Sequence, residues 1–129
     1  MTNSGLGEIR EMSEIVRAAA EIRFTPVGPG VEMGLVRAHG NGGMSALFRM
    51  KKGAVAIRHS HPGGEETLML RGQLRIQNRS GASGAVVPDI VLNAGGYAFV
   101  LPGESHDAVA EEDSEFFVVA VGGLEPKTV

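Results

Sequence analysis

Short apolar segments separated by glycine and proline are the feature that most limits the fold of this chain. The sequence contains 19 glycines and 6 prolines among 129 residues. Glycine supplies the backbone angles that tight turns need, and proline is excluded from the middle of helices and central strands. Their spacing here is typical of the turns of an all-β domain. The sequence therefore predicts a β-sandwich or β-barrel.

Eight apolar segments between these turns have the length of β-strands. In the segment 44–50, apolar residues at every second position alternate with residues that include Ser45 and Arg49. The segment 73–77 alternates in the same way, and such segments bury one face of a sheet. The predicted strands cover residues 31–36, 44–50, 54–59, 66–71, 73–77, 90–92, 96–101 and 115–121.

The remaining chain is predicted to add a helix, a loop and a tail. Residues 8–23 fit a short helix, because apolar residues recur there at helical spacing. Residues 80–84 fit a loop, and residues 127–129 fit a loose tail. We expect a single domain over residues 1–129, with an extension over 1–30 and a barrel over about 31–121.

Composition narrows the partners of the chain. Hydrophobic residues make up 43% and charged residues 21%, which is typical of a globular protein. The net charge is −3 and no basic run is present, so nucleic acid is not expected as a partner. Neither a leader peptide nor a membrane span can be recognised, which predicts a cytoplasmic protein that does not bind membranes.

The absence of cysteine restricts the chemistry. Disulfides and thiolate metal sites are excluded, so a metal would need nitrogen and oxygen ligands. The chain also lacks a P-loop and the nucleophile motif of Ser-His-Asp hydrolases. Histidines and carboxylates are therefore the candidate functional residues.

The run HSHPGGEE, which starts at His59, is the clearest such cluster. Strand alternation places His59 and His61 on one face, where two imidazoles can reach the same metal ion. Pro62 and two glycines then turn the chain, and a carboxylate at the start of the next strand can approach both rings. Alternation alone does not decide whether that carboxylate is Glu65 or Glu66.

The spacing of this run resembles the first motif of the cupin family at every position: Gly53, five residues, His59, one, His61, three, Glu65, six, Gly72. The resemblance favours Glu65 as the ligand. A second cupin motif is matched in part by Gly96, Pro102, Gly103 and His106. There the proline and glycine are adjacent, and Ala110 stands where the family has asparagine.

This resemblance implies an all-β fold, namely the double-stranded β-helix or jelly-roll-like barrel of cupins. It also implies one divalent metal ion held by His59, His61, Glu65 and His106. The segment HSHPGGEETLMLRG is particularly similar to the cupin domain of ChrR-like anti-sigma factors, which implies a zinc-type site. We do not expect anti-sigma activity, because few residues precede the predicted barrel.

Several other residues are weighed as parts of a site. His39 is expected in a loop, and Arg58 and Arg71 are expected on a solvated outer face. Tyr97 is a candidate acid of the pocket, although an exposed hydroxyl is an equal alternative. Glu104 could support His106, but exposure in a loop is the preferred prediction. Core packing is preferred over a pocket role for the methionines Met33, Met44, Met50 and Met69.

Two functions are compared. The first is a small-molecule metalloenzyme of the dioxygenase, isomerase, lyase or cyclase type, with Fe(II), Mn(II), Ni(II), Co(II) or Zn(II) as its metal. The alternative is a non-catalytic zinc-binding sensor of the ChrR-like type. A metal-free carbohydrate-binding barrel is a third, less favoured reading. The apolar run at residues 116–119 exceeds what one strand face can bury, so a homodimer is expected.

Overall fold

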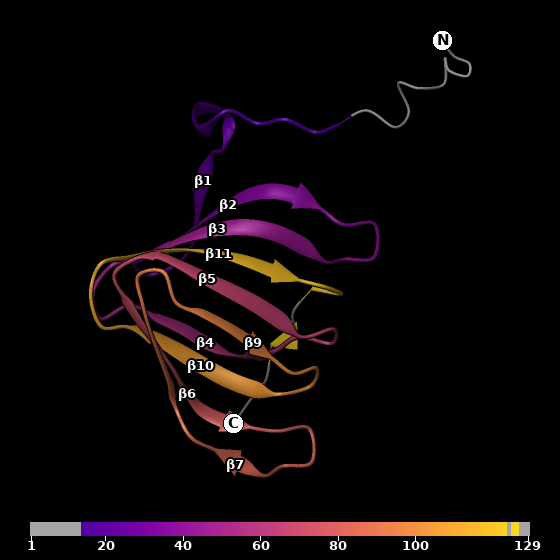
Figure 1. The fold of residues 1–129 in the computed structure, drawn as a ribbon, viewed down its shortest axis with the longest axis vertical. Helices are drawn as coiled ribbons and strands as arrows, with labels where there is room; N and C mark the ends of the chain where they lie inside the picture. The colour runs from indigo at the N-terminus through magenta and orange to yellow at the C-terminus, as the bar shows by residue number, and fades with distance from the viewer. Residues whose placement is uncertain (1–13, 124, 127–129) are drawn as a thin grey trace.

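The computed structural model describes residues 14–123 and 125–126, and its regular structure is almost entirely β (Figure 1). The first strands are β1 (Phe24–Gly28), β2 (Val31–Ala38), β3 (Met44–Met50), β4 (Val55–Ser60), β5 (Glu65–Arg71) and β6 (Gln73–Ser80). The remaining strands are β7 (Val86–Val87), β8 (Ile90–Asn93), β9 (Tyr97–Val100), β10 (Ser105–Ala110), β11 (Ser114–Ala120) and β12 (Glu125–Pro126).

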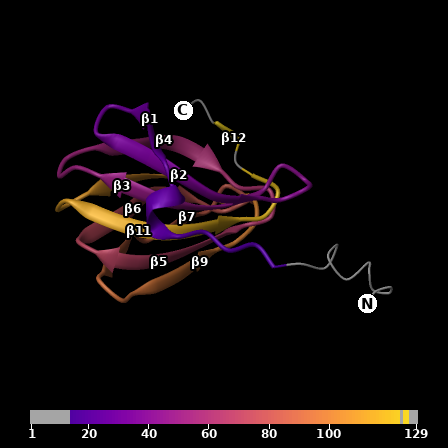
Figure 2. The same cartoon turned by 90° about the horizontal axis from the view of Figure 1, so that it is seen from above.

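The strands form two facing antiparallel sheets (Figures 1 and 2). One sheet has the order β1-β2-β3-β11-β5-β9, and the other has the order β12-β4-β10-β6-β7 with β8 also paired to β6. Strands β1, β2 and β3 are consecutive in the sequence, but other neighbours, such as β3 and β11 or β4 and β10, come from distant parts of it because the chain crosses between the sheets. The prediction of an all-β sandwich or barrel is confirmed.

The predicted N-terminal helix is wrong over its described part, where only a 3₁₀ turn at Ala19–Glu21 forms. Ile15 and Val16 are exposed, so these two apolar residues find no surface to pack on. Residues 8–13 of that prediction lie outside the described residues, as does the predicted tail. The part of the chain that the structure describes contains no helix long and apolar enough to span a bilayer.

The core lies between the two sheets, where alternate residues of each strand point inward. In β10 and β11 every second residue is buried, which is the pattern of strands with one covered face. The rings of Phe48 and Phe116 stack with centroids 5.6 Å apart on neighbouring strands. The core comprises Val31, Met50, Met69, Leu74, Ile76, Leu92, Ala98, Ala108, Ala110, Phe116, Val118 and Ala120.

Gly72, in the tight turn between β5 and β6, is required by sterics as well as by its backbone angle. Its φ is +87°, a region that L-residues rarely adopt. A Cβ atom built at Gly72 would lie 2.3 Å from the carbonyl oxygen of Asp113 and 2.4 Å from Ser114 Oγ. This close approach joins the β5–β6 turn to the start of β11.

We expect Gly72→Ala to destabilise the fold more than a change at an open turn. Gly53 has nearly the same φ, +86°, but no atom lies within 4 Å of its virtual Cβ. Gly53→Ala should therefore cost only the backbone term of about 1–2 kcal/mol. Gly72→Ala should cost roughly a further 1–3 kcal/mol for overpacking. Urea unfolding of both variants measures the difference, and equal losses would contradict the steric explanation.

Candidate metal centre

Four chemistry-bearing side chains are brought together by three strands. His59 lies on β4 directly opposite His106 on β10, so the strand register alone brings these two rings together. His61 follows the end of β4, and Glu65 opens β5 after the Pro-Gly-Gly turn. Residues distant in sequence thus meet at one end of the space between the sheets.

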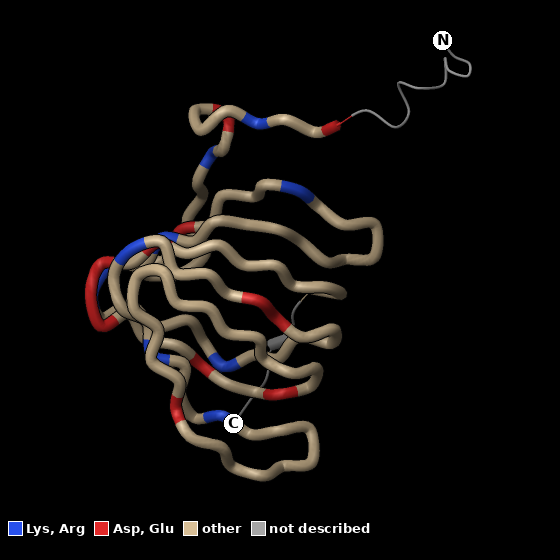
Figure 3. Tube along the Cα trace, viewed as in Figure 1, with Lys and Arg blue, Asp and Glu red and all other residues tan. Residues whose placement is uncertain are grey.

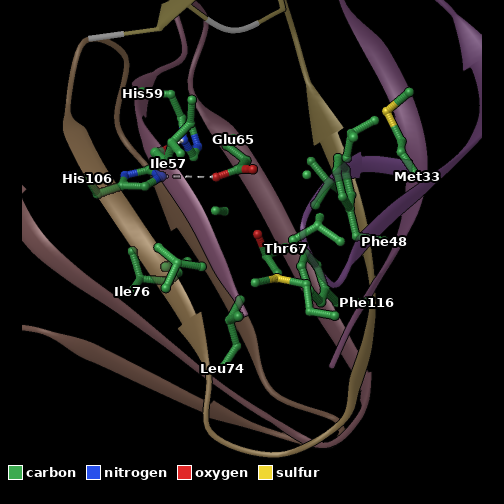
Figure 4. A pocket seen from close by; sticks show the side chains of 18 of the residues that line it. Met33, Phe48, Ile57, His59, Glu65, Thr67, Leu74, Ile76, His106 and Phe116 are labelled. Atoms are coloured by element: carbon green, nitrogen blue, oxygen red, sulfur yellow. Dashed lines mark hydrogen bonds and ion pairs between the residues drawn. The ribbon is translucent and has the colours of Figure 1, made fainter. Parts of the chain in front are cut away.

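The donor atoms converge closely enough for one ion. One nitrogen or oxygen from each of His59, His61, Glu65 and His106 lies within 4.8 Å of all the others. Glu65 Oε1 lies 3.2 Å from His61 Nε2 and 3.6 Å from His106 Nε2, and Figure 4 shows Glu65 directed at the His106 ring. Ligand bonds of about 2.0–2.2 Å place donor pairs roughly 3–4.4 Å apart, so only a small contraction is needed.

Each imidazole is oriented through its Nδ1 atom. His59 Nδ1 lies 2.6 Å from the carbonyl oxygen of Ile57, and His61 Nδ1 lies 3.1 Å from that of Gly123. His106 Nδ1 lies 3.2 Å from Glu104 Oε2. Donation from Nδ1 leaves the Nε2 lone pair free, which is the arrangement of metal-binding histidines.

The buried Nε2 atom of His61 tests whether the cluster fits a metal ion. This atom has no hydrogen-bond partner, although Glu65 Oε1 lies 3.2 Å away. Buried polar atoms are normally satisfied. A metal ion between the donors would satisfy it, and the nitrogen and oxygen donor set suits a divalent transition ion.

The pKa values favour an ionised carboxylate. Burial acts against charge on Glu65, but the adjacent imidazoles of His106 and His61 outweigh it and lower the pKa of Glu65 to about 2. Burial lowers the pKa of His59. Burial opposes charge on His61 too, but Glu65 and the Gly123 carbonyl outweigh it and raise the pKa of His61. Glu65 is therefore an ionised carboxylate at neutral pH and can act as a ligand to a cation.

Strand alternation left open whether Glu65 or Glu66 approaches the histidines, and the structure places the two side chains on opposite faces of β5. Glu65 points into the cluster, whereas Glu66 points outward and accepts a hydrogen bond of 2.8 Å from the hydroxyl of Tyr97. Tyr97 is 56% exposed and does not line the cavity. The candidate role of Tyr97 as an acid of the pocket is therefore wrong, because β9 turns its side chain to the outer face.

The prediction that Glu104 is an exposed loop residue is wrong. Glu104 is only 5% exposed, and both of its oxygens accept hydrogen bonds of 2.8 Å from the guanidinium of Arg79. This ion pair raises the pKa of Arg79. Neither Arg79 nor the Gly123 carbonyl stands out in the sequence, because their contacts depend on strand pairing and chain reversal.

The four residues lie at one end of an apolar cavity of about 320 Å³. Figure 4 shows Leu74, Ile76 and Phe116 beyond the cluster in this cavity. No Lys or Arg is among the lining residues that the structure describes, and Thr67 is the polar residue there besides the four candidate ligands. Core packing was the preferred prediction for four methionines, and Met50 and Met69 belong to the core cluster while Met44 packs against it. Met33, Met44 and Met50 also line the cavity.

The remaining candidates lie apart from the cluster. His39 Nε2 is 3.0 Å from Ser45 Oγ, outside the donor set. Arg58 contacts Ser80 and the Asn78 carbonyl on the far side of its strand. Arg71 pairs with Glu115. None of these three side chains faces the donor atoms, in agreement with the sequence-based expectation.

Comparison with known sequences identifies relatives of the chain. The family described as the ChrR cupin-like domain matches residues 12–125. The DNA damage-repair/toleration protein DRT102 of Arabidopsis thaliana is 31% identical over 119 residues, covering 91% of this chain and 36% of that protein. This chain thus spans little more than a third of that relative.

Solved structures share the architecture at low identity. An RmlC-like cupin from Shewanella frigidimarina has a TM-score of 0.67 at 20% identity, covering 89% of this chain and 93% of its own. An acetylacetone dioxygenase from Acinetobacter johnsonii gives 0.66 at 16%, covering 84% and 73%. A chain of the Rhodobacter sphaeroides complex of SigE with the anti-sigma ChrR gives 0.63 at 23%, covering 81% and 52%. The predicted cupin barrel is confirmed.

We expect Glu65 to contribute stability that is lost in acid. Its pKa is about 2 in the folded protein and 4.5 in the unfolded chain, so the contribution is complete above pH 4.5 and disappears as the pH falls toward 2. In the metal-free protein, the free energy of unfolding should fall more steeply across this range than in Glu65→Gln, as measured by urea denaturation. Glu66→Gln, on the outer face, should keep the wild-type slope. Parallel curves for all three proteins would refute the assignment.

Proposed function

Since this chain belongs to the ChrR cupin-like domain family, we propose that it binds one divalent metal ion through His59, His61, Glu65 and His106. We propose further that the ion acts on a small apolar substrate in the adjoining cavity. The observation that carries this proposal is the convergence of four donors, three of them oriented through Nδ1, at the end of that cavity.

The chemistry of the four donors limits which metal ions the site would bind. Three imidazole nitrogens and one carboxylate suit Fe(II), Mn(II), Co(II), Ni(II) or Zn(II), and they leave one or two positions open on a six-coordinate ion. Open positions next to a cavity favour a substrate-binding centre over a purely structural one. When bound, the metal would supply Lewis-acid activation of an oxygen donor and, as Fe(II), reactivity toward dioxygen.

The residues that line the cavity limit the class of substrate that would bind there. No Lys or Arg is among the described lining residues, so none of them pairs with a phosphate or with a carboxylate placed away from the metal. The substrate class is therefore a compact, mainly apolar molecule with one or two oxygen atoms that reach the metal. Phe48, Phe116 and Met33 would pack against its apolar part and exclude water, and the Thr67 hydroxyl could hydrogen-bond one oxygen.

The lining residues also limit the types of reaction that the site would catalyse. Isomerases, lyases and cyclases that move protons need a protein acid or base at the substrate. Apart from the four candidate ligands, no titratable side chain lines the described part of the cavity. This favours chemistry carried by the metal, and among the candidate reactions a dioxygenase fits best. A β-diketone or enol is the first substrate to test, which agrees with the acetylacetone dioxygenase among the structural relatives.

A non-catalytic sensor is the second candidate. It is favoured by the family match to the ChrR cupin-like domain and by the same lack of a separate acid or base. In that case zinc would fill the centre, and an apolar effector would bind beside it without turnover.

The homodimer and the cytoplasmic location also stay part of the proposal. The outer face of β11, β5 and β9 presents Phe117 beside Leu68, with the exposed Phe99 nearby. This apolar face supports a homodimer, which sedimentation analysis would test.

We expect wild-type protein purified without an affinity tag to contain nearly one equivalent of a divalent metal. The double variant His59→Ala, His61→Ala should lose at least about 90% of it, because removing ligands weakens binding far beyond tenfold. Mass spectrometry of metal content is the measurement. His39→Ala, which changes a histidine outside the cluster, should retain the metal. Metal-free wild-type protein that also fails to take up added metal would overturn the site.

Substrate turnover separates the enzyme from the sensor. We expect the Fe(II)-loaded protein to consume dioxygen when given an apolar β-diketone and not when given a sugar phosphate, because no Lys or Arg is among the cavity residues that the structure describes. An oxygen electrode follows the reaction, and the Zn(II)-loaded protein is the redox-silent control. Tight binding of the diketone without oxygen uptake would favour the sensor.

A further inference from the structure

An irregularity in strand β6 lies directly opposite the candidate ligand His106. Ser80 pairs with Ser105 and Gln77 pairs with Asp107, so two residues of β6 face the single residue His106 of β10. These two residues are Asn78 and Arg79. The extra residue makes this a β-bulge, a device that redirects side chains and is frequent next to functional sites.

Asn78 stabilises the bulge. Its φ is 51°, in the left-handed region that asparagine tolerates better than most residues. Its side-chain amide donates to Asp107 Oδ2 at 2.9 Å, and Gln77 Nε2 donates to the other oxygen of Asp107 at 2.9 Å. The bulge is thus held in place by side-chain hydrogen bonds across the strand pair.

The bulge directs Arg79 to Glu104. The guanidinium forms two hydrogen bonds of 2.8 Å to the carboxylate and also donates to the carbonyl of Pro88. Both side chains are largely buried, at 15% and 6% exposure. Such a two-point contact fixes the carboxylate in one orientation. Glu104 Oε2 in turn lies 3.2 Å from His106 Nδ1.

His106 therefore differs from the other two histidines in its support. His59 and His61 are held by neutral backbone carbonyls, whereas His106 is held by a carboxylate. A hydrogen bond to a charged acceptor is stronger than one to a neutral acceptor, and such a partner fixes the orientation of a metal-binding ring. Among the described cluster residues, this is the one imidazole whose strength as a ligand depends on side chains.

We propose that Arg79 and Glu104 are positioning residues that orient His106 and strengthen its binding to the metal, with the β6 bulge placing Arg79 for this role. This inference rests on the proposed metal site. Glu104 would act on the metal through His106, and Arg79 would act through Glu104. A simple structural role, in which the ion pair only holds β6 against the β9–β10 turn, is the alternative.

The test measures metal binding by purified metal-free protein. We expect Glu104→Gln and Arg79→Met each to weaken Zn(II) affinity by about 10–100-fold, as determined by competition with a chromogenic chelator. The visible absorption of the Co(II)-loaded protein should also shift, because it reports the ligand geometry. In the double variant the loss should be no more than about twofold beyond that of Glu104→Gln alone, because Arg79 acts through Glu104.

A matched ion pair on the same strand supplies the control. Arg75 pairs with Glu111 and Asp89 at the surface, away from the candidate ligands. Arg75→Met removes a guanidinium from β6 and should leave Zn(II) affinity and the Co(II) spectrum unchanged. The thermal stability of each metal-free variant is measured in parallel, since a purely structural role would lower stability without changing metal affinity.

The outcomes separate this inference from the site itself. If wild-type protein binds neither Zn(II) nor Co(II), the metal site falls and the inference falls with it. If wild-type protein binds and the Glu104 and Arg79 variants lose less than about fivefold, only the positioning role is overturned. A loss of at least fivefold with an unchanged Arg75 variant supports it.

A measurement on wild-type protein keeps the test open if a variant does not fold. In the Zn(II)-loaded protein, ¹⁵N-labelled histidine spectra should show a proton on Nδ1 of His106, further downfield than those of His59 and His61. The charged acceptor is the reason for this order. A His106 ring protonated on Nε2 and bound through Nδ1 would contradict the arrangement.

Discussion

The pairing of β4 with β10 is the constraint on which the site depends. It sets His59 directly opposite His106, a residue far from it in the sequence. A shift of one residue would turn one of these side chains to the opposite face of the sheet. The bulges on β4 and β6, the two strands that flank β10, show that regular pairing is interrupted beside His106 on both sides of its strand.

Burying the polar groups of the cluster is unfavourable unless nearby residues supply hydrogen-bond partners for them. Three imidazoles and a carboxylate occupy an end of the barrel where the remaining surroundings are apolar, and groups of this kind need partners when buried. The Nδ1 atoms obtain theirs from Ile57, Gly123 and Glu104. Close contact between Gly63 and Val121 brings the chain after β11 near enough for the Gly123 carbonyl to reach His61.

Sequence reasoning succeeded where chemistry is encoded in spacing. The intervals between Gly53, His59, His61, Glu65 and Gly72 predicted which residues converge, and the turn pattern predicted an all-β fold. It failed where partners are set by tertiary contact. Strand β10 was not among the predicted strands, because SHDAVA lacks the apolar alternation of a typical strand. Pairing on both edges nevertheless holds it in the sheet.

The burial of Glu104 also depends on a tertiary contact that the sequence does not reveal. The position of Glu104 two residues before His106 suggested support for that ring, yet a glutamate in a Pro-Gly turn is normally solvated. The distant Arg79 reverses this expectation, and it reaches Glu104 from an irregular strand position that no periodicity reveals.

The walls of the cavity belong to the hydrophobic core as well. Met50, Ile76 and Val118 line the cavity and pack in the core cluster, so a substitution that reshapes the floor of the cavity also removes packing between the sheets. Val27 and Ile57 line it too, but both are exposed. Evolution and protein engineering would therefore find new ligand preferences more readily at this rim, where a change in shape leaves the folding of the barrel almost untouched.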